Sequence, residues 1–175
     1  MFIELLQQRR SIRQFKSTAI TPEQLAQMSE ALLRAPTSRG RNPWHFVIVD
    51  DPQLLTQLSK AKAHGAEFLA KAPLAVAICA EPAVSDVWVE DCAIAAIILQ
   101  LTAESLGLGS CWAQMRLRSD ANGRSAEENV CEILNLPEAW SVDCIIGIGQ
   151  PSQRPAGHPR ASLPDGKIHR NRQPK

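Results

Sequence analysis

Hydrophobic residues recur at helical and strand spacings along most of the chain. Residues 2–9 and 21–35 repeat their apolar positions every three or four residues, which predicts two amphipathic helices. Thr21 directly before Pro22 is typical of a helix start. Further along, short β-branched apolar runs alternate with longer helical patterns. They predict strands at 44–50, 72–80, 110–115 and 141–150, and helices at 51–61, 88–109 and 125–136.

This alternation of buried strands with long helices predicts an α+β layered fold. Residues 88–109 are apolar on nearly every side, so this helix must be covered on all sides, either at the centre of the chain or against a second subunit.

No linker or repeat divides residues 1–150, which are expected to form one domain. After Pro151 the composition shifts to proline, glycine, arginine and histidine. Residues 151–175 are therefore expected to be an extended tail of the same domain.

Composition and charge narrow the classes of protein. A chain of 175 residues can bury a core without disulfides or metals. The net charge of +1 argues against a general affinity for nucleic acid. The longest apolar stretch, 93–103, is too short to span a bilayer, and Glu4 interrupts any signal-peptide pattern. A cytoplasmic protein with neither a membrane nor a nucleic-acid partner is expected.

No side-chain pattern for catalysis or metal binding stands out. The chain has no G-x-G-x-x-G, G-x-S-x-G or H-E-x-x-H motif, and its four histidines are scattered singly. The five cysteines lack C-x-x-C spacing and have apolar neighbours, so they are predicted to be reduced, buried thiols. No metal site and no catalytic side chain is predicted. Such a chain either binds a ligand or takes its chemistry from a cofactor.

The stretch RRSIRQF at residues 9–15 is the first candidate binding segment. Its arginines could simply stabilise the C-terminal end of a helix, where cations meet the negative end of the dipole. Alternatively, Arg9, Arg10, Ser11 and Arg13 offer the charge-assisted donors that suit a phosphate monoester. A second polar loop, between Arg34 and the strand at 44–50, presents further donors and could be a plain turn or the wall of a ligand site.

Together, RRSIRQF, APTSRGRNPWHFVIV, LGLGSCW and IIGIGQPSQRP resemble the FMN-dependent nitroreductase family, in order and over almost the whole chain. The short length is similar to that of the compact members. The resemblance implies a three-layer fold with a central mixed or antiparallel sheet of about four to five strands flanked by helices. It also implies an intertwined homodimer with two active sites at the interface, in which the 88–109 helix lies in the dimer core and the tail packs on the partner subunit.

The resemblance further implies a bound FMN. The family's first motif grips its phosphate and ribityl chain, and matches Arg9, Arg10, Ser11 and Arg13. The second motif approaches the flavin of the partner subunit, and matches Pro36, Thr37, Ser38, Gly40, Asn42, Pro43 and Trp44. Backbone groups that meet the isoalloxazine correspond to Cys111, Trp112 and Ala113. A basic tail residue returns to the phosphate; Arg160 and Arg172 are the choices, with Lys167 and Arg170 as alternatives.

Two positions depart from the family pattern. Gly40 stands where asparagine is usual, which would remove a side-chain hydrogen bond to the flavin. Asn42 stands where glutamine is usual, and would supply a shorter amide.

The activity implied is ping-pong: NAD(P)H delivers hydride to flavin N5 and leaves, and a nitroaromatic, quinone or flavin acceptor then takes the electrons. An alternative is a non-catalytic or differently specialised FMN-binding protein on the same fold. A third reading, in which the arginines bind single-stranded nucleic acid, is disfavoured because no aromatic residues are interleaved with them.

Overall fold

The computed structural model describes residues 1–172, so the last three residues of the predicted tail, 173–175, lie outside the described part. All nine predicted helices and strands are present. The helices are α1 (Phe2–Gln8), α2 (Pro22–Leu33), α3 (Pro52–Leu58), α4 (Trp88–Ser105) and α5 (Ala126–Leu134). The strands are β1 (Trp44–Val49), β2 (Leu74–Ala80), β3 (Gly109–Gln114) and β4 (Ser141–Gly149). The structure also contains short 3-10 helices that the sequence analysis did not predict: η1 (Ser38–Gly40), η2 (Glu67–Lys71), η3 (Arg160–Ser162) and η4 (Asp165–Lys167).

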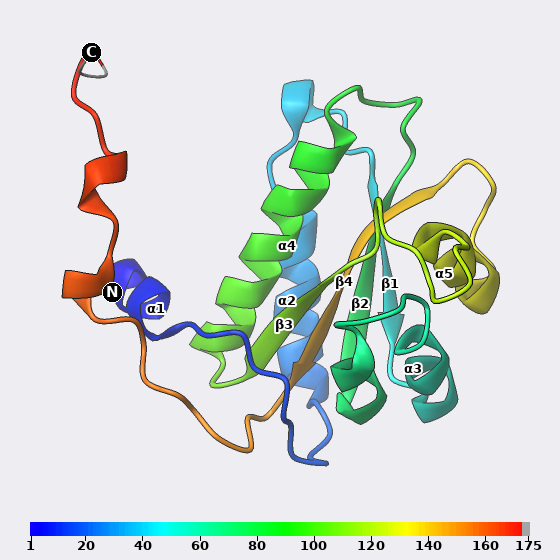
Figure 1. Cartoon of the computed structure of the whole chain (residues 1–175), viewed down its shortest axis with the longest axis horizontal. Helices are drawn as coiled ribbons and strands as arrows, with labels where there is room; N and C mark the ends of the chain where they lie inside the picture. The colour runs from blue at the N-terminus through cyan, green and yellow to red at the C-terminus, as the bar shows by residue number, and fades with distance from the viewer. Residues whose placement is uncertain (173–175) are drawn as a thin grey trace.

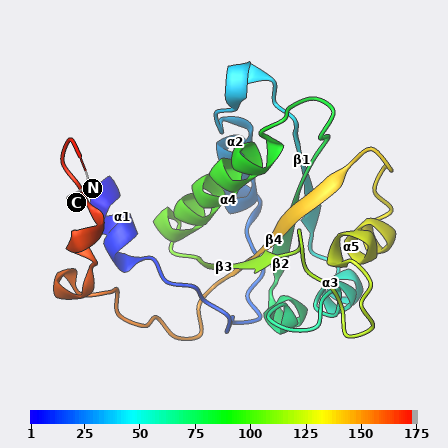
Figure 2. The ribbon, with the colours of Figure 1, turned by 45° about the horizontal axis from the view of Figure 1, so that its top comes forward.

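The central sheet has four strands in the order β1-β2-β4-β3, and every neighbouring pair is antiparallel. Helices α2 and α4 cover one face, and α3 and α5 cover the other (Figures 1 and 2). The α+β, three-layer prediction is therefore confirmed, and the sheet is purely antiparallel. Its two faces each carry a hydrophobic cluster, with Ile145 and Met115 buried on the α3/α5 side and Leu99 and Ile146 buried on the α4 side.

Helix α4 is the longest helix, with 18 residues, and ends earlier than predicted. Gly107 has a φ of 74°, which stops the helix, and Gly109 already begins β3. Its sheet-facing side is fully buried, but Ile94 and Ile97 are each 38% exposed. Within one chain, the side of α4 that carries Ile94 and Ile97 is therefore not covered, although the sequence predicted a helix buried on every side. None of the helices between residues 1 and 172 is apolar enough over a sufficient length to cross a membrane.

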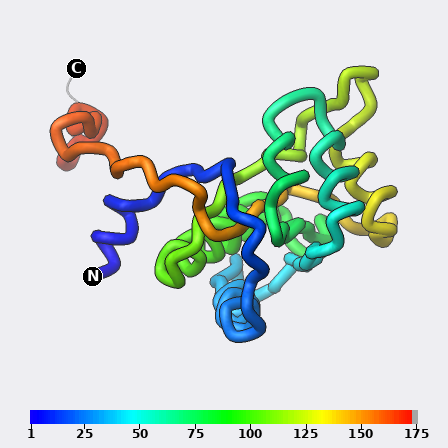
Figure 3. The backbone as a smooth tube through the Cα atoms, turned by 90° about the horizontal axis from the view of Figure 1, so that it is seen from below, coloured from blue at the N-terminus to red at the C-terminus, as the bar shows by residue number. Residues whose placement is uncertain are grey.

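The two ends of the chain run side by side beneath the sheet before they leave the body (Figure 3). The Lys16 amide donates to the Gln150 carbonyl at 2.8 Å, and the Ser152 amide donates to the Gln14 carbonyl at 3.0 Å. Helix α1 and residues 151–172 contain no buried side chain. The described part of the tail, which contains η3 and η4, and helix α1 therefore both lie outside the hydrophobic core.

Candidate functional site

The predicted phosphate-binding segment, residues 9–13, lies against the start of β3. The Arg9 amide closes α1 by donating to the Leu5 carbonyl at 2.8 Å. Three residues further, the Ile12 amide donates to the Ser110 carbonyl at 2.9 Å, and the Ile12 side chain is buried over Gly109. A Cβ atom at Gly109 would lie 2.7 Å from Ile12 Cγ1. Glycine at this position is what allows the segment to approach the strand so closely.

We expect Gly109→Ala to lower the free energy of unfolding by about 1–3 kcal/mol, because the added methyl group overpacks the contact with Ile12. Ile12→Ala alone should cost about 2–5 kcal/mol through the cavity it leaves. The double variant should lose less than the sum of the two single losses, since each change makes room for the other. Urea unfolding of the four proteins measures this coupling; strictly additive losses would contradict the contact.

A cavity of about 320 Å³ opens beside this segment. Residues 153–155 after β4 form its other wall, and the full lining is Ser11, Ile12, Arg13, Gln14, Gln153, Arg154 and Pro155. The Arg13 side chain makes no ion pair within residues 1–172, so its charge is available to a ligand. Arg10 differs, because its guanidinium donates to the Ala156 carbonyl and thereby holds the tail segment in place.

Cys111 lies next to this cavity on the α3/α5 face of β3. Burial raises the pKa of its thiol, while the positive charge of Arg13 and a hydrogen bond with Ser11 act in the opposite direction. The positive charge of Lys62 lowers the pKa of Cys111 as well, so a further cation lies near this thiol. The pKa of Lys62 itself is lowered by partial burial and by neighbouring Arg118. The sequence analysis did not identify Lys62.

The backbone of β3 fits the predicted role of Cys111, Trp112 and Ala113. Because β3 is an edge strand that pairs with β4 on one side, part of its backbone remains unused by the sheet. The Trp112 side chain turns toward α4, where its indole N–H donates to Gln114 Oε1 at 2.9 Å. Contacts from this strand to a ligand edge would therefore be made by backbone groups.

The second predicted group, the loop at residues 36–44, is a compact turn tied to the first turn of α4. The Thr37 hydroxyl donates to Asn42 Oδ1 at 2.9 Å and accepts from the Asn42 amide at 3.0 Å. The Ser38 amide donates to Asp91 Oδ1 at 2.8 Å, and Asp91 is 2% exposed. Asp91, which the sequence analysis missed, thus anchors the loop from the positive end of the α4 dipole.

Position 40 can accommodate the asparagine that the family pattern shows there. Gly40 has a φ of 64°, in the left-handed region that asparagine tolerates best among residues with side chains, and nothing lies within 4 Å of a Cβ built on it. Packing and backbone conformation therefore do not require glycine at position 40. The effect of glycine in place of asparagine is the loss of a side chain that could form hydrogen bonds.

One chain does not bring its two predicted groups together. The loop at residues 36–44 lies at the N-terminal end of α4, whereas residues 9–13 and 150–157 lie at its C-terminal end (Figure 1). An 18-residue α-helix is about 27 Å long, so the two groups are separated by most of the molecule. Each would have to meet the complementary group of another chain to form a common site.

The tail arginines lie away from the 320 Å³ cavity. Arg160 forms an ion pair with Asp165 at 2.8 Å, and its side chain is 71% exposed. Arg172 and the alternatives Lys167 and Arg170 are exposed in the same extended segment. Among the residues after β4, the cation that does line the cavity is Arg154, which lies ahead of the basic stretch at residues 159–172 from which the sequence analysis chose its candidates.

Comparisons with known proteins identify relatives over nearly the full length. Residues 6–81 and 61–150 match the profile of the nitroreductase family. A protein of Archaeoglobus fulgidus, provisionally named NADH dehydrogenase/NAD(P)H nitroreductase, is 31% identical over 85% of this chain and 84% of its own. The structure of an FMN-dependent nitroreductase from Clostridium difficile R20291 superposes with a TM-score of 0.95 at 41% identity, covering 98% of this chain and 99% of that one. A structure from Parabacteroides distasonis, provisionally named NADH dehydrogenase/NAD(P)H nitroreductase, gives 0.88 at 28% identity, with 98% of both chains covered.

Proposed function

The chain belongs to the nitroreductase family, and on this basis we propose that it is an FMN-dependent oxidoreductase that oxidises NAD(P)H and reduces a nitroaromatic, quinone or flavin acceptor. The observation that carries the proposal is the cavity beside β3, where Ser11 and Arg13 stand together with a row of backbone groups. The full-length relative whose name includes FMN has the same architecture at 41% identity.

The residues present fit an FMN molecule. A flavin phosphate carries nearly two negative charges at neutral pH, and Arg13, which forms no ion pair within residues 1–172, supplies compensating charge together with Arg9 at the end of α1. Ser11 adds a hydroxyl donor at the cavity. The edge of β3 offers backbone groups to the ring, and Lys62 adds a cation on the same side. When bound, FMN supplies the hydride acceptor and electron donor that no side chain of this protein provides.

We also propose a homodimer, since the site is incomplete in one chain. The loop at residues 36–44 would reach the flavin held by residues 9–13 of a second copy. Apolar side chains are available for such an interface: Ile94 and Ile97 on α4 and, on α1, Phe2, Ile3 and Leu6 are exposed. Residues 151–172, which have no buried side chain, would pack on the partner subunit.

The purified full-length protein is expected to be yellow, with about one FMN per chain, because each chain has one such cavity beside the start of β3. It should oxidise NADH or NADPH with a nitroaromatic or quinone acceptor. A ping-pong sequence predicts parallel double-reciprocal plots when the acceptor concentration is varied. A colourless protein that takes up no FMN on titration would refute the proposal.

A second candidate, a non-catalytic FMN-binding protein, is favoured by one observation. Gly40 removes the side chain that would approach the flavin, although the space and backbone conformation there suit asparagine. This candidate predicts the same flavin content but no reduction by either nicotinamide. Activity gained by Gly40→Asn in an otherwise inactive protein would support it.

A further inference from the structure

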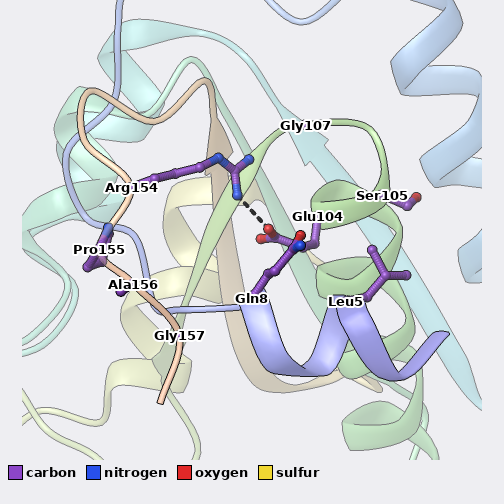
Figure 4. A pocket seen from close by; sticks show the side chains of 9 residues that line it. All are labelled: Leu5, Gln8, Glu104, Ser105, Gly107, Arg154, Pro155, Ala156 and Gly157. Carbon is purple, nitrogen blue, oxygen red and sulfur yellow. Dashed lines mark hydrogen bonds and ion pairs between the residues drawn. The ribbon is translucent and has the colours of Figure 1, made fainter. Parts of the chain in front are cut away.

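Two cavities near the proposed flavin site differ in how their charges are balanced. The first, of about 500 Å³, lies between α1, the end of α4 and residues 154–157. Figure 4 shows the Arg154 guanidinium directed at the Glu104 carboxylate, to which it donates. The Glu104 side chain is only 4% exposed, so this buried anion needs the cation beside it. The two charges therefore balance each other.

The second cavity, of about 320 Å³, has cations in its lining that no such anion balances. Residues between 59 and 67 line one side and residues 120–122 line the other, and it is named the lysine cavity after Lys60 and Lys62. Lys60 is exposed and Lys62 is half-buried. Neither lysine forms an ion pair within residues 1–172. Their charges are therefore available to a ligand.

The carboxylates in the same lining are engaged by other donors. Both oxygens of Glu67 accept from the Gly65 amide, at 2.8 and 3.0 Å. Asp120 accepts from two backbone amides of its own loop through Oδ1 and from the Asn129 side chain through Oδ2. These two acidic groups therefore shape the walls of the lysine cavity without pairing with its lysines.

A third cation, Arg118, stands beside the lysine cavity. Its neighbour Ser119 accepts the Ala63 amide at 3.0 Å, which ties the two walls together. The Arg118 side chain is exposed and forms no ion pair within residues 1–172. Partial burial and the charge of Arg118 lower the pKa of Lys62 by more than Glu67 raises it. Cations held together in this way are stabilised when an anion binds between them.

The lysine cavity adjoins the proposed flavin site. Burial raises the pKa of the Cys111 thiol, and the charges of Arg13 and Lys62 lower it, so Lys62 lies near the strand that meets the flavin. A nicotinamide ring that delivers hydride must lie against the flavin ring, and the rest of the dinucleotide then extends over the neighbouring surface. Its pyrophosphate is anionic, and NADPH adds a 2′-phosphate with about two further charges at neutral pH.

We propose that Lys60 and Arg118, next to Lys62, bind phosphate groups of the nicotinamide dinucleotide and make NADPH the preferred hydride donor over NADH. The inference rests on the proposed function, since it names the dinucleotide that the same site uses. Charge complementarity carries it: the two loops present cations that have no protein anion within the described residues, and NADPH is the more anionic of the two donors.

The test compares NADPH and NADH with 1-benzyl-1,4-dihydronicotinamide, which has the reactive ring and no phosphate. FMN-loaded full-length protein is assayed with each donor and one quinone, and wild type should show a higher kcat/KM for NADPH than for NADH. Lys60→Ala with Arg118→Ala should lower kcat/KM for NADPH roughly tenfold or more, the loss expected for a hydrogen bond to a charged group. NADH should lose less, and the phosphate-free donor should lose nothing. Because both side chains are exposed, the variant should fold and keep its flavin.

Arg34→Ala with Lys71→Ala is the matched control. It also removes one exposed arginine and one exposed lysine, and both lie outside the lining of the lysine cavity, so no value should change. An unchanged NADPH value in the Lys60/Arg118 variant would overturn the inference, as would equal losses for all donors or for NADPH and NADH. A wild-type preference for NADH would overturn it too. A flavin-loaded wild type that accepts hydride from none of the donors would instead refute the proposed function.

Discussion

Replacement of Arg9 and Arg13 together by alanine is expected to release FMN while the fold is retained. Each arginine contributes a charge-assisted bond of about 1.5–3 kcal/mol to the phosphate, so their joint loss should weaken binding by roughly 10² to 10⁴-fold. The fold should survive because Arg13 is exposed, makes no ion pair within residues 1–172 and lies outside the hydrophobic core. Ile12, between them, keeps the segment on β3.

Gel filtration followed by the ratio of flavin to protein absorbance measures the loss. A double variant of two other arginines, Arg34→Ala with Arg124→Ala, changes net charge equally and serves as control. Both of these arginines form exposed ion pairs with helical residues outside the cavity lining, Arg34 with Glu30 of α2 and Arg124 with Glu132 of α5. Full flavin occupancy in the Arg9/Arg13 variant, or equal loss in the control, would show that the phosphate is held elsewhere.

Disruption of the dimer is expected to abolish both flavin binding and activity. Ile94→Asp together with Ile97→Asp places two carboxylates on the exposed side of α4, where burial of unpaired charges against a second copy would cost several kcal/mol. Size-exclusion chromatography with light scattering should then give one chain of 19.2 kDa, without bound FMN. Leu117→Asp, at an apolar position with 73% exposure in another loop, should remain dimeric. A monomeric wild-type protein that retains FMN would contradict the shared site.

A mixed dimer tests the sharing of the site more directly. One chain carries Arg9→Ala and Arg13→Ala, and the other carries Thr37→Ala and Asn42→Ala, which removes the hydrogen bonds that shape the loop. If each site combines residues 9–13 of one chain with residues 36–44 of the other, one site of the mixed dimer is intact. We expect about half the wild-type flavin content, above that of either parent homodimer. A mixed dimer with no more flavin than its parents would place both groups in the same chain's site.

The sequence predicted the elements well because their signals are local. Thr21 and Pro22 begin α2 as expected, and the Thr21 side chain caps the helix by accepting from the Gln24 amide. The end of α4 was misplaced by four residues, because Gly107 and Gly109 both end a helical pattern and only the sheet pairing shows that Gly109 belongs to β3.

The site was predicted less completely, since its remaining residues meet only through the fold. In the sequence, Asp91 looks like an ordinary acidic residue in the first turn of a helix. In the structure it accepts a hydrogen bond from the Ser38 amide, 53 positions away along the chain. Arg154 and Glu104 are 50 positions apart, and neither has a sequence neighbour that indicates a buried ion pair. Lys62 is likewise placed near Cys111 by long-range packing. The motifs in the sequence named the two candidate groups, but they did not indicate the supporting residues or the separation of the groups along α4.

Anaerobic reduction of the purified protein by NADH and by NADPH tests the central claim most directly. The claim is that the chain binds FMN in order to pass electrons from a nicotinamide to an acceptor. We expect the visible absorbance band of the flavin to bleach with at least one nicotinamide and to return when a quinone or nitroaromatic is added. Bound flavin that neither nicotinamide reduces would contradict the claim and favour the non-catalytic alternative.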